Sequence, residues 1–191
     1  MRFDPGIEVQ CEEGVYEPAE DSRLIIEAIS VSPGERVLDV GCGTGIIALH
    51  CAKAGAKVTA SDISVSAAMC AKANAIKNNL ELDVSACDLL EGIEGEFDII
   101  IFNPPYLPRG APDDRRWTGG ESGIETALRF LGQCKGRLAV GGRVMTVVSS
   151  LSGSKRFEES AEGMGYSHKV AARRHIFFED LTVYELVPAS E

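Results

Sequence analysis

The chain has 191 residues and a formal net charge of −10 at pH 7, and 45% of its residues are hydrophobic and 25% charged. This composition is typical of a globular domain with a sizeable core and excludes the disordered and fibrous classes. The negative charge disfavours tight, sequence-independent binding of DNA or RNA, because an acidic surface repels phosphate.

Two further patterns bear on location and metal content. No apolar stretch approaches the roughly 18 residues that a membrane span needs, and the acidic first residues lack the features of a signal peptide. We therefore expect a soluble, cytoplasmic protein. The six cysteines are scattered without a Cys-x-x-Cys pair, so we expect reduced, mostly buried thiols and no metal site.

Residues 1–17 are predicted to form an N-terminal extension. They contain a turn signal at residues 4–6 and a short apolar alternation that predicts a small hairpin over residues 7–15. A helix is then predicted to start at Pro18, with two acids in its first turn, and to end at the Ser-Pro-Gly sequence of residues 32–34.

Strand and helix patterns alternate through the rest of the chain. Strands are predicted at residues 36–40, 57–61, 82–86, 97–102, 144–149, 167–172 and 181–186. Helices are predicted at residues 46–54, 65–78, 124–138 and 154–164, and Gly141-Gly142 is predicted to turn the chain into the fifth strand. This alternation predicts a single α/β domain over residues 1–191, with a mostly parallel seven-stranded sheet and helices on both faces.

A polar tip follows the predicted central strand. It consists of Asn103, Pro104, Pro105 and Tyr106, and two successive prolines cannot continue a central ladder. The asparagine amide and the proline carbonyls can hold a planar N–H₂ group by its two hydrogens, and the tyrosine ring can stack on a flat group. The alternative is an ordinary turn after a strand.

A glycine-rich turn joins the strand at 36–40 to the next helix. Gly41, Gly43 and Gly45 allow the turn to close and a ligand to approach the backbone, as in nucleotide-binding folds. The third glycine of the dinucleotide fingerprint would fall on Ile46, which argues against NAD. Asp39, just before the turn, would repel a pyrophosphate but suits an ammonium group.

Aspartates stand at the ends of three successive predicted strands: Asp39, Asp62 and Asp88. Taken alone, each of them could be a loop or helix cap. S-adenosylmethionine carries an ammonium group, ribose hydroxyls and an adenine amine, and no phosphate, so each acid has a partner in this molecule. Together with the glycine turn, the three acids predict that S-adenosylmethionine is the cofactor.

The motifs resemble those of class I methyltransferases that modify amino groups conjugated to a planar system. The resemblance rests on Val-Leu-Asp-Val-Gly-Cys-Gly-Thr-Gly at residues 37–45 and on the Asn-Pro-Pro-Tyr tip. Residues 15–22 and 117–120 also resemble the short archaeal and eukaryotic branch of the HemK family. Those enzymes methylate the glutamine of the Gly-Gly-Gln motif in class 1 translation release factors. The resemblance spans nearly the whole chain and implies a Rossmann-like methyltransferase fold.

Matching positions imply a set of cofactor-binding residues. They are Tyr16, Ser22, Asp39, Gly41, Gly43, Gly45, Asp62, Ile63, Asp88, Leu89 and Asn103. Asp39 and Gly41 would hold the methionine part of the cofactor, Asp62 its ribose, and Asp88 with Leu89 its adenine.

The tip is expected to carry out the chemistry. Asn103, Pro104, Pro105 and Tyr106 are all predicted to be catalytic, and Asn103, Pro104 and Tyr106 are also predicted to bind the acceptor amide. The loop at residues 107–122 is predicted to position the substrate, a disordered connection being the alternative.

The resemblance also implies partners. The substrate would be a class 1 release factor, and the chain would form a heterodimer with a small zinc-binding activator subunit, a Trm-type adaptor. An edge strand with Leu82 and Val84 could accept such pairing. Other activities stay open at this point: adenine-N6 methylation of DNA or RNA, methylation of a protein lysine or a small molecule, and a noncatalytic cofactor-binding role.

Overall fold

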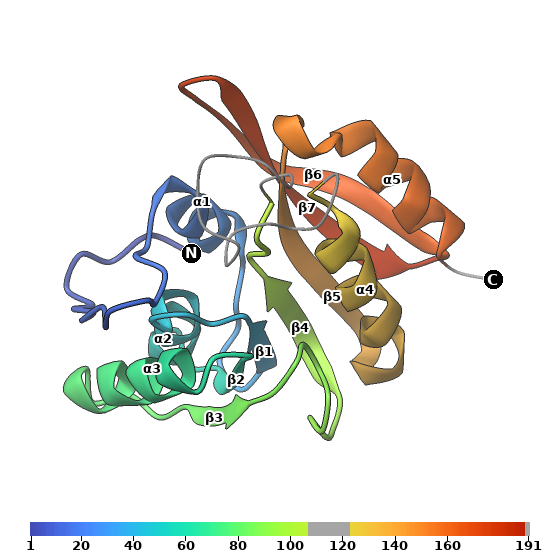
Figure 1. Cartoon of the computed structure of the whole chain (residues 1–191). Helices are drawn as coiled ribbons and strands as arrows, with labels where there is room; N and C mark the ends of the chain where they lie inside the picture. The colour runs from blue at the N-terminus through green and yellow to red at the C-terminus, as the bar shows by residue number, and fades with distance from the viewer. Residues whose placement is uncertain (107–122, 190–191) are drawn as a thin grey trace.

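The computed structural model of the chain describes residues 1–106 and 123–189. Seven strands form one sheet with helices on both faces (Figure 1). The strands are β1 (Arg36–Val40), β2 (Lys57–Asp62), β3 (Asp83–Ala86), β4 (Phe97–Phe102), β5 (Leu138–Ser149), β6 (Tyr166–Ile176) and β7 (Glu179–Pro188). The helices are α1 (Glu20–Ala28), α2 (Ile46–Lys53), α3 (Val65–Lys77), α4 (Glu125–Cys134) and α5 (Ser154–Gly163), with short 3₁₀ turns η2 (Lys135–Arg137) and η3 (Ser150–Ser152).

The strand order is β3-β2-β1-β4-β5-β7-β6. Strands β1 to β5 pair in parallel, whereas β7 runs antiparallel between β5 and β6. The predicted mostly parallel seven-stranded sheet and Rossmann-like fold are therefore confirmed. The sheet order reverses between β1 and β4, and ligands of open α/β sheets bind outside the carboxyl ends of strands at such a point.

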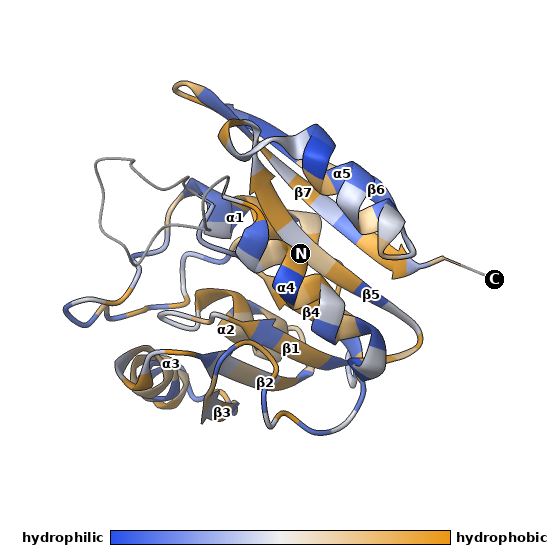
Figure 2. Ribbon diagram, turned by 45° about the vertical axis from the view of Figure 1, so that its right-hand side comes forward, coloured by the Kyte–Doolittle hydropathy of each residue, from blue (hydrophilic) through white to orange (hydrophobic). Residues whose placement is uncertain are grey.

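Alternate residues of the buried strands feed two separate cores. Ile99 and Ile101 of β4 pack with apolar residues of α1, α2 and α3, while Ile100 and Phe102 face α4 and α5. Figure 2 shows the strongly apolar central strands between these helical layers. Burial on both faces explains why β4 is a continuous apolar run and not an alternating one.

The N-terminal hairpin predicted over residues 7–15 is wrong. The segment is irregular and lies along α3, where two asparagine side chains take the place of a partner strand. Asn74 accepts from the Gln10 N–H (2.8 Å) and donates to the Gln10 carbonyl (2.9 Å). Asn78 likewise accepts from the Glu8 N–H (3.0 Å) and donates to the Glu8 carbonyl (2.7 Å). These bonds satisfy the backbone groups that a hairpin would have paired.

Strand β5 also differs from its prediction, because it begins at Leu138 and not at residue 144. Gly141 and Gly142 lie inside the strand, where the register with β4 shifts between Phe97 and Ile99. The predicted turn is thus an irregularity within a longer strand, and α4 ends earlier, at Cys134. Strands β6 and β7 extend beyond the predicted 167–172 and 181–186 and meet in a two-residue turn.

Two smaller expectations concern cysteines and membrane spans. Four cysteines are buried, Cys11 is exposed and Cys87 is half-buried, and all six are free thiols. Within the described ranges, none of the helices has both the length and the apolar character that crossing a bilayer requires.

The predicted substrate loop at residues 107–122, with its 117–120 motif, lies outside the described residues.

Candidate functional site: a cavity at the carboxyl ends of four strands

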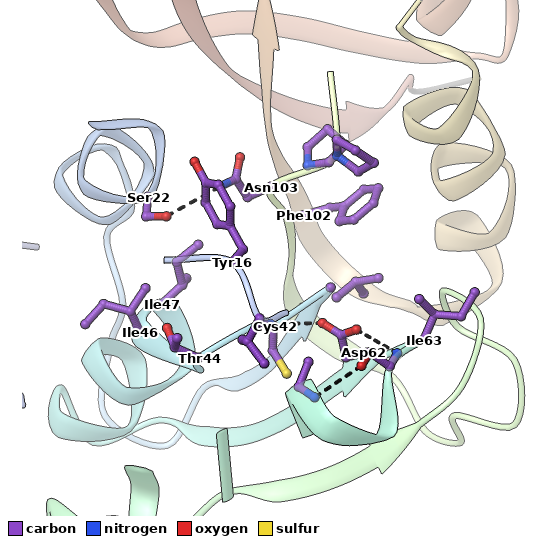
Figure 3. A pocket seen from close by; sticks show the side chains of 18 of the residues that line it. Tyr16, Ser22, Cys42, Thr44, Ile46, Ile47, Asp62, Ile63, Phe102 and Asn103 are labelled. Carbon is purple, nitrogen blue, oxygen red and sulfur yellow. Dashed lines mark hydrogen bonds between the residues drawn. The ribbon is translucent and has the colours of Figure 1, made fainter. Parts of the chain in front are cut away.

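A cavity of about 870 Å³ opens at the carboxyl ends of β1 to β4. Its volume lies in the range of small-molecule and cofactor sites. Among the described residues, its wall comes from the N-terminal segment 13–18, the start of α1, the segments that follow the four strands, α4 and the first residue of β7. Figure 3 shows Tyr16, Ser22 and Asn103 on one side of this cavity and Asp62 and Ile63 on another.

The glycine turn after β1 has a shape that larger residues would not tolerate. Gly41 has φ +64°, and a Cβ there would come within 2.9 Å of the Phe102 ring. Gly45 has φ +81°, and a Cβ there would come within 2.9 Å of the Ala71 Cβ on α3. Gly41 and Gly43 line the cavity, whereas Gly45 does not and instead allows α2 and α3 to approach each other.

Asp62, at the end of β2, is fixed by backbone donors. Its Oδ2 accepts from the Gly43 N–H and its Oδ1 from the Ser64 N–H, each at 2.9 Å. The carboxylate therefore joins the glycine turn to the start of α3. Each carboxylate oxygen has two lone pairs, so both oxygens keep the capacity to accept a ligand hydroxyl.

Asp88, after β3, forms an ion pair across the cavity wall with Arg129 of α4, at 2.6 Å between Nη2 and Oδ2. Its neighbour Leu89 is buried and adopts φ +52°. Both residues line the cavity, as does Ile63. Arg129 was not predicted from the sequence, since an arginine in an amphipathic helix gives no sign of a partner 41 residues away.

Asp39 is the predicted residue whose position differs most from expectation. It is 1% exposed and does not line the cavity, because its Oδ2 is turned to the Ala48 N–H at 3.1 Å. Its Oδ1 has no hydrogen-bond partner in the described part of the chain. Burial without a full set of donors raises the pKa of this carboxyl group to about 7, and the nearby charge of Asp62 acts in the same direction.

Asn103 is held at the tip of β4 by its amide nitrogen. Its Nδ2 donates to the Ser22 Oγ at 3.5 Å, as drawn in Figure 3. Its Oδ1 is buried and has no hydrogen-bond partner among the described residues. A buried carbonyl oxygen without a donor is costly in a folded protein unless a ligand satisfies it. This atom is therefore an acceptor that is available to a ligand N–H group.

A buried carboxylate, Asp21 at the start of α1, organises the two tyrosines of the site. Its Oδ2 accepts from the Tyr16 hydroxyl at 2.8 Å and from the Tyr106 hydroxyl at 3.4 Å, and its Oδ1 accepts from the Ser22 N–H at 2.6 Å. Burial, and then the charge of Asp21, raises the pKa of both tyrosines, which stay protonated. The Ser152 Oγ donates to the Tyr106 carbonyl and fixes the tip from the other side.

The structure thus brings most of the predicted site together. The predicted residues that line the cavity are Tyr16, Ser22, Gly41, Gly43, Asp62, Ile63, Asp88, Leu89, Asn103, Pro104, Pro105 and Tyr106. Asp39 and Gly45 lie behind the wall. Lining residues that the sequence did not single out include Asp21, Arg129 and Glu179. In the sequence, Asp21 is one of two acids in the first turn of the predicted helix, and no sequence signal distinguishes that role from the one in the structure.

Comparisons with known proteins show which family the chain is similar to. Residues 7–175 match the methyltransferase small domain family. A Methanocaldococcus jannaschii protein, whose name gives protein N5-glutamine methyltransferase as its inferred activity, is 37% identical over 185 residues, covering 93% of this chain and 94% of that protein. The release factor glutamine methyltransferase of Deinococcus radiodurans is 35% identical over 64% of this chain and 49% of its own length.

One solved structure with a similar chain is a complex of two proteins. It is the E. cuniculi Mtq2-Trm112 complex, responsible for the methylation of the eRF1 translation termination factor. The match has a TM-score of 0.72 and 26% identity, and it covers 92% of this chain and 99% of the matched chain. These matches confirm the resemblance to the HemK family. The chain therefore belongs to the methyltransferase small domain family and is a methyltransferase.

Proposed function

We propose that this chain transfers a methyl group from S-adenosylmethionine to the side-chain amide nitrogen of the glutamine in the Gly-Gly-Gln motif of a class 1 release factor. The observation that carries the proposal is the buried Oδ1 of Asn103, an acceptor without a partner among the described residues at the edge of a cofactor-sized cavity. The names of the similar proteins support the choice of a glutamine amide as acceptor.

The residues around the cavity fit S-adenosylmethionine. The glycine turn lines the cavity with bare backbone at Gly41 and Gly43, and the Asp62 oxygens keep lone pairs that can accept hydroxyl groups of a ribose. Asp88 and Leu89 would frame the adenine, and Ser22 and Asn103 line the same cavity. We assign the methionine ammonium group to the turn that follows Asp39, where a bound cation would favour the ionised form of this carboxyl group behind the wall.

The bound cofactor would supply an electrophilic methyl group on a sulfonium centre. The protein's task is to make an amide nitrogen nucleophilic, since its lone pair is delocalised into the carbonyl. The Oδ1 of Asn103 and the Pro104 carbonyl would accept the two amide hydrogens and favour a pyramidal nitrogen. Fixed acceptors of this kind stabilise positive charge only as it develops on the nitrogen, which is stabilisation of the transition state.

The two tyrosines would position the flat amide. Tyr106 and Tyr16 share the carboxylate of Asp21, so their rings are held at a fixed relation to the Asn103 tip. Alignment of reacting groups can supply roughly 7–11 kcal/mol of the barrier reduction. A nitrogen-protonated amide is a strong acid, so the proton that remains after methyl transfer can leave to water without a strong base.

The positions of the histidines fit a reaction that needs no histidine base. None of the three lines the cavity in the described structure. His50 is buried in α2, where its ring nitrogens bond to the Ile46 carbonyl at 2.8 Å and the Asp4 N–H at 3.0 Å, and its ring stacks on Phe3. Burial lowers the pKa of His50. This is a structural histidine and not a general base.

The charge of the cavity favours a protein acceptor over a nucleic acid. Six carboxylates and one guanidinium line it among the described residues, and the guanidinium, from Arg129, is paired with Asp88. An adenine amine would also suit the Asn103 tip, but a flipped base brings its phosphates with it, and these would be repelled. Methylation of adenine N6 is therefore disfavoured.

We propose a small zinc-binding adaptor subunit as the partner, as the family resemblance implies, and the complex of the similar Mtq2 chain with Trm112 supports a partner subunit. Strand β3 forms one edge of the sheet and pairs, within the described ranges, with β2 alone. Helix α3 packs beside β3 and exposes Val65, Met69 and Ile76 at helical spacing. An adaptor strand paired to β3 would bury these side chains. Leu82, predicted to belong to this edge strand, lies just before it.

One experiment tests the proposed function directly. The chain, with and without a co-expressed adaptor, is incubated with release factor and S-adenosylmethionine labelled in the methyl group, and the modified residue is mapped by mass spectrometry. Label on the Gly-Gly-Gln glutamine, and none on a factor in which that glutamine is replaced by alanine, is the expected result. Label on a lysine, or on an oligonucleotide offered in parallel, would instead select one of the alternative activities. Because the proposed substrate is a translation factor, the reaction would take place in the cytoplasm.

A further inference from the structure

The turn between β6 and β7 exposes two adjacent phenylalanines. Phe177 is 91% exposed and Phe178 is 93% exposed. The hairpin that carries them stands out from the body of the molecule at the top of Figure 1, and Figure 2 shows its tip as apolar. Two phenylalanine side chains offer roughly 300–500 Å² of contact area, which is the size of a functional patch on a typical soluble protein.

The conformation of the turn gives no folding reason for these residues. Ile176 pairs with Glu179, so Phe177 and Phe178 are the two central residues of the hairpin turn. Phe177 has φ +46°, a conformation in which glycine is the preferred residue and a bulky aromatic is an outlier. Neither burial nor backbone preference therefore accounts for a phenylalanine at this position.

The tip is held in a fixed position next to the cavity. Arg174 of β6 forms ion pairs with Glu20 and Glu27 of α1, at 2.8 and 2.7 Å, and α1 also carries Asp21 and Ser22 of the site. On β7, the Asp180 N–H donates to the Ser150 Oγ at 3.0 Å. Both strands of the hairpin are thus anchored close to the turn, which holds the two phenylalanines in a defined position at the surface.

Glu179 makes the patch continuous with the cavity. It directly follows Phe178, lines the cavity, and accepts a hydrogen bond from the Ser149 Oγ. Exposed Glu13 and Glu17 line the same cavity from the N-terminal segment. The entrance therefore combines an aromatic tip with an acidic rim, and a complementary partner would offer an apolar depression beside basic side chains.

We propose that the Phe177–Phe178 tip is a docking surface for the methyl-acceptor protein, and that it binds an apolar depression flanked by basic residues next to the acceptor glutamine. This inference rests on the proposed function, because it takes the acceptor to be a folded protein that presents a glutamine to the Asn103 tip. Docking of this kind raises the affinity for the intact acceptor without taking part in methyl transfer. It would contribute to KM and leave kcat unchanged.

The test compares four forms of the enzyme, each with its adaptor where one copurifies: wild type, Phe177→Ser/Phe178→Ser, Phe177→Leu/Phe178→Leu, and Val140→Ser as control. Val140 is also a fully exposed apolar residue, but it lies near the start of β5, at the end of the sheet opposite the cavity. The measurements are kcat and KM for intact release factor, and the Kd for S-adenosylmethionine by calorimetry.

The serine double variant should raise KM at least about 10-fold, the effect of losing an aromatic anchor, with kcat and the cofactor Kd within about twofold of wild type. The leucine variant should retain most of the affinity, and Val140→Ser should match wild type. An unchanged KM would overturn the proposal. So would a fall in kcat or in cofactor affinity, which would show that the tip shapes the cavity, or weaker adaptor binding with KM unaltered. A wild-type enzyme that binds the cofactor but leaves release factor unmethylated would refute the proposed function itself, and the docking proposal with it.

Discussion

The buried carboxyl group of Asp39 should make the stability of this fold depend on pH in an unusual direction. Its pKa is raised from 3.8 to about 7, mainly because burial removes it from water. Such a group stabilises the fold below its unfolded pKa, because the folded chain holds the proton more tightly. This stabilisation is lost as the pH rises through the folded value. Between pH 5 and pH 8 the loss amounts to about 2–3 kcal/mol.

Asp39→Asn isolates this contribution. Asparagine cannot ionise, and its carbonyl can still accept from the Ala48 N–H that Asp39 contacts at 3.1 Å. The free energy of unfolding of the variant, measured without cofactor by urea titration and circular dichroism, should therefore gain about 2–3 kcal/mol relative to wild type between pH 5 and pH 8. Groups that do not interact with Asp39 titrate alike in both proteins, so the difference between them reports Asp39 together with its coupling to neighbours such as Asp62.

A matched control removes the same charge from the surface. Asp83 is exposed at the edge strand β3, and Asp83→Asn should change stability by less than about 0.5 kcal/mol at every pH. The reasoning is refuted if the difference between Asp39→Asn and wild type stays flat from pH 5 to pH 8. That outcome would mean that Asp39 is ionised in the folded protein throughout this range.

Three further predictions concern other parts of the site. Asn103→Ala should lower methylation at least about 100-fold, the scale for losing a key stabilising acceptor, while calorimetry still shows cofactor binding; near-wild-type turnover would contradict the mechanism. Asp21→Asn should lower the free energy of unfolding by about 1–3 kcal/mol in urea titrations. The N–H₂ group of the new asparagine would face the hydroxyl and N–H donors that the Asp21 carboxylate now accepts from. An unchanged midpoint of the urea titration would argue against the shared carboxylate. Gly45→Ala should cost about 1–3 kcal/mol, since its Cβ would come within 2.9 Å of the Ala71 Cβ; a calorimetric Tm equal to that of wild type would show that α2 and α3 can separate freely.

The central strands were predictable because their sequence signals are local. β1 and β4 have the predicted bounds of 36–40 and 97–102, since each apolar run is ended by glycine or proline, which act through the backbone itself. The hairpin predicted over residues 7–15 failed because its backbone groups are satisfied by Asn74 and Asn78, 64 and 70 residues away. Partners at that separation leave no trace in a local pattern.

The residues of the site also differ in whether local sequence signals could predict them. Residues that act through their place at a strand end, such as Asp62 and Asn103, could be predicted because parallel topology gathers strand ends at one edge. Asp39 also follows this rule, but a single hydrogen bond to Ala48 turns its side chain into the core. Asp21 could not be predicted, since its role depends on tyrosine hydroxyls that arrive from two other segments.

The irregular N-terminal segment has a consequence for how ligands exchange. Residues 13–18 form one wall of the cavity without belonging to any helix or strand, so this wall should open at a lower free energy than the sheet behind it. Opening of the segment alone would release a spent cofactor while α2 and β4 stay folded. A bound ligand should close this route in proportion to its affinity. The rate at which this segment opens would then set an upper limit on turnover. Substitutions at Asn103 would not change that limit.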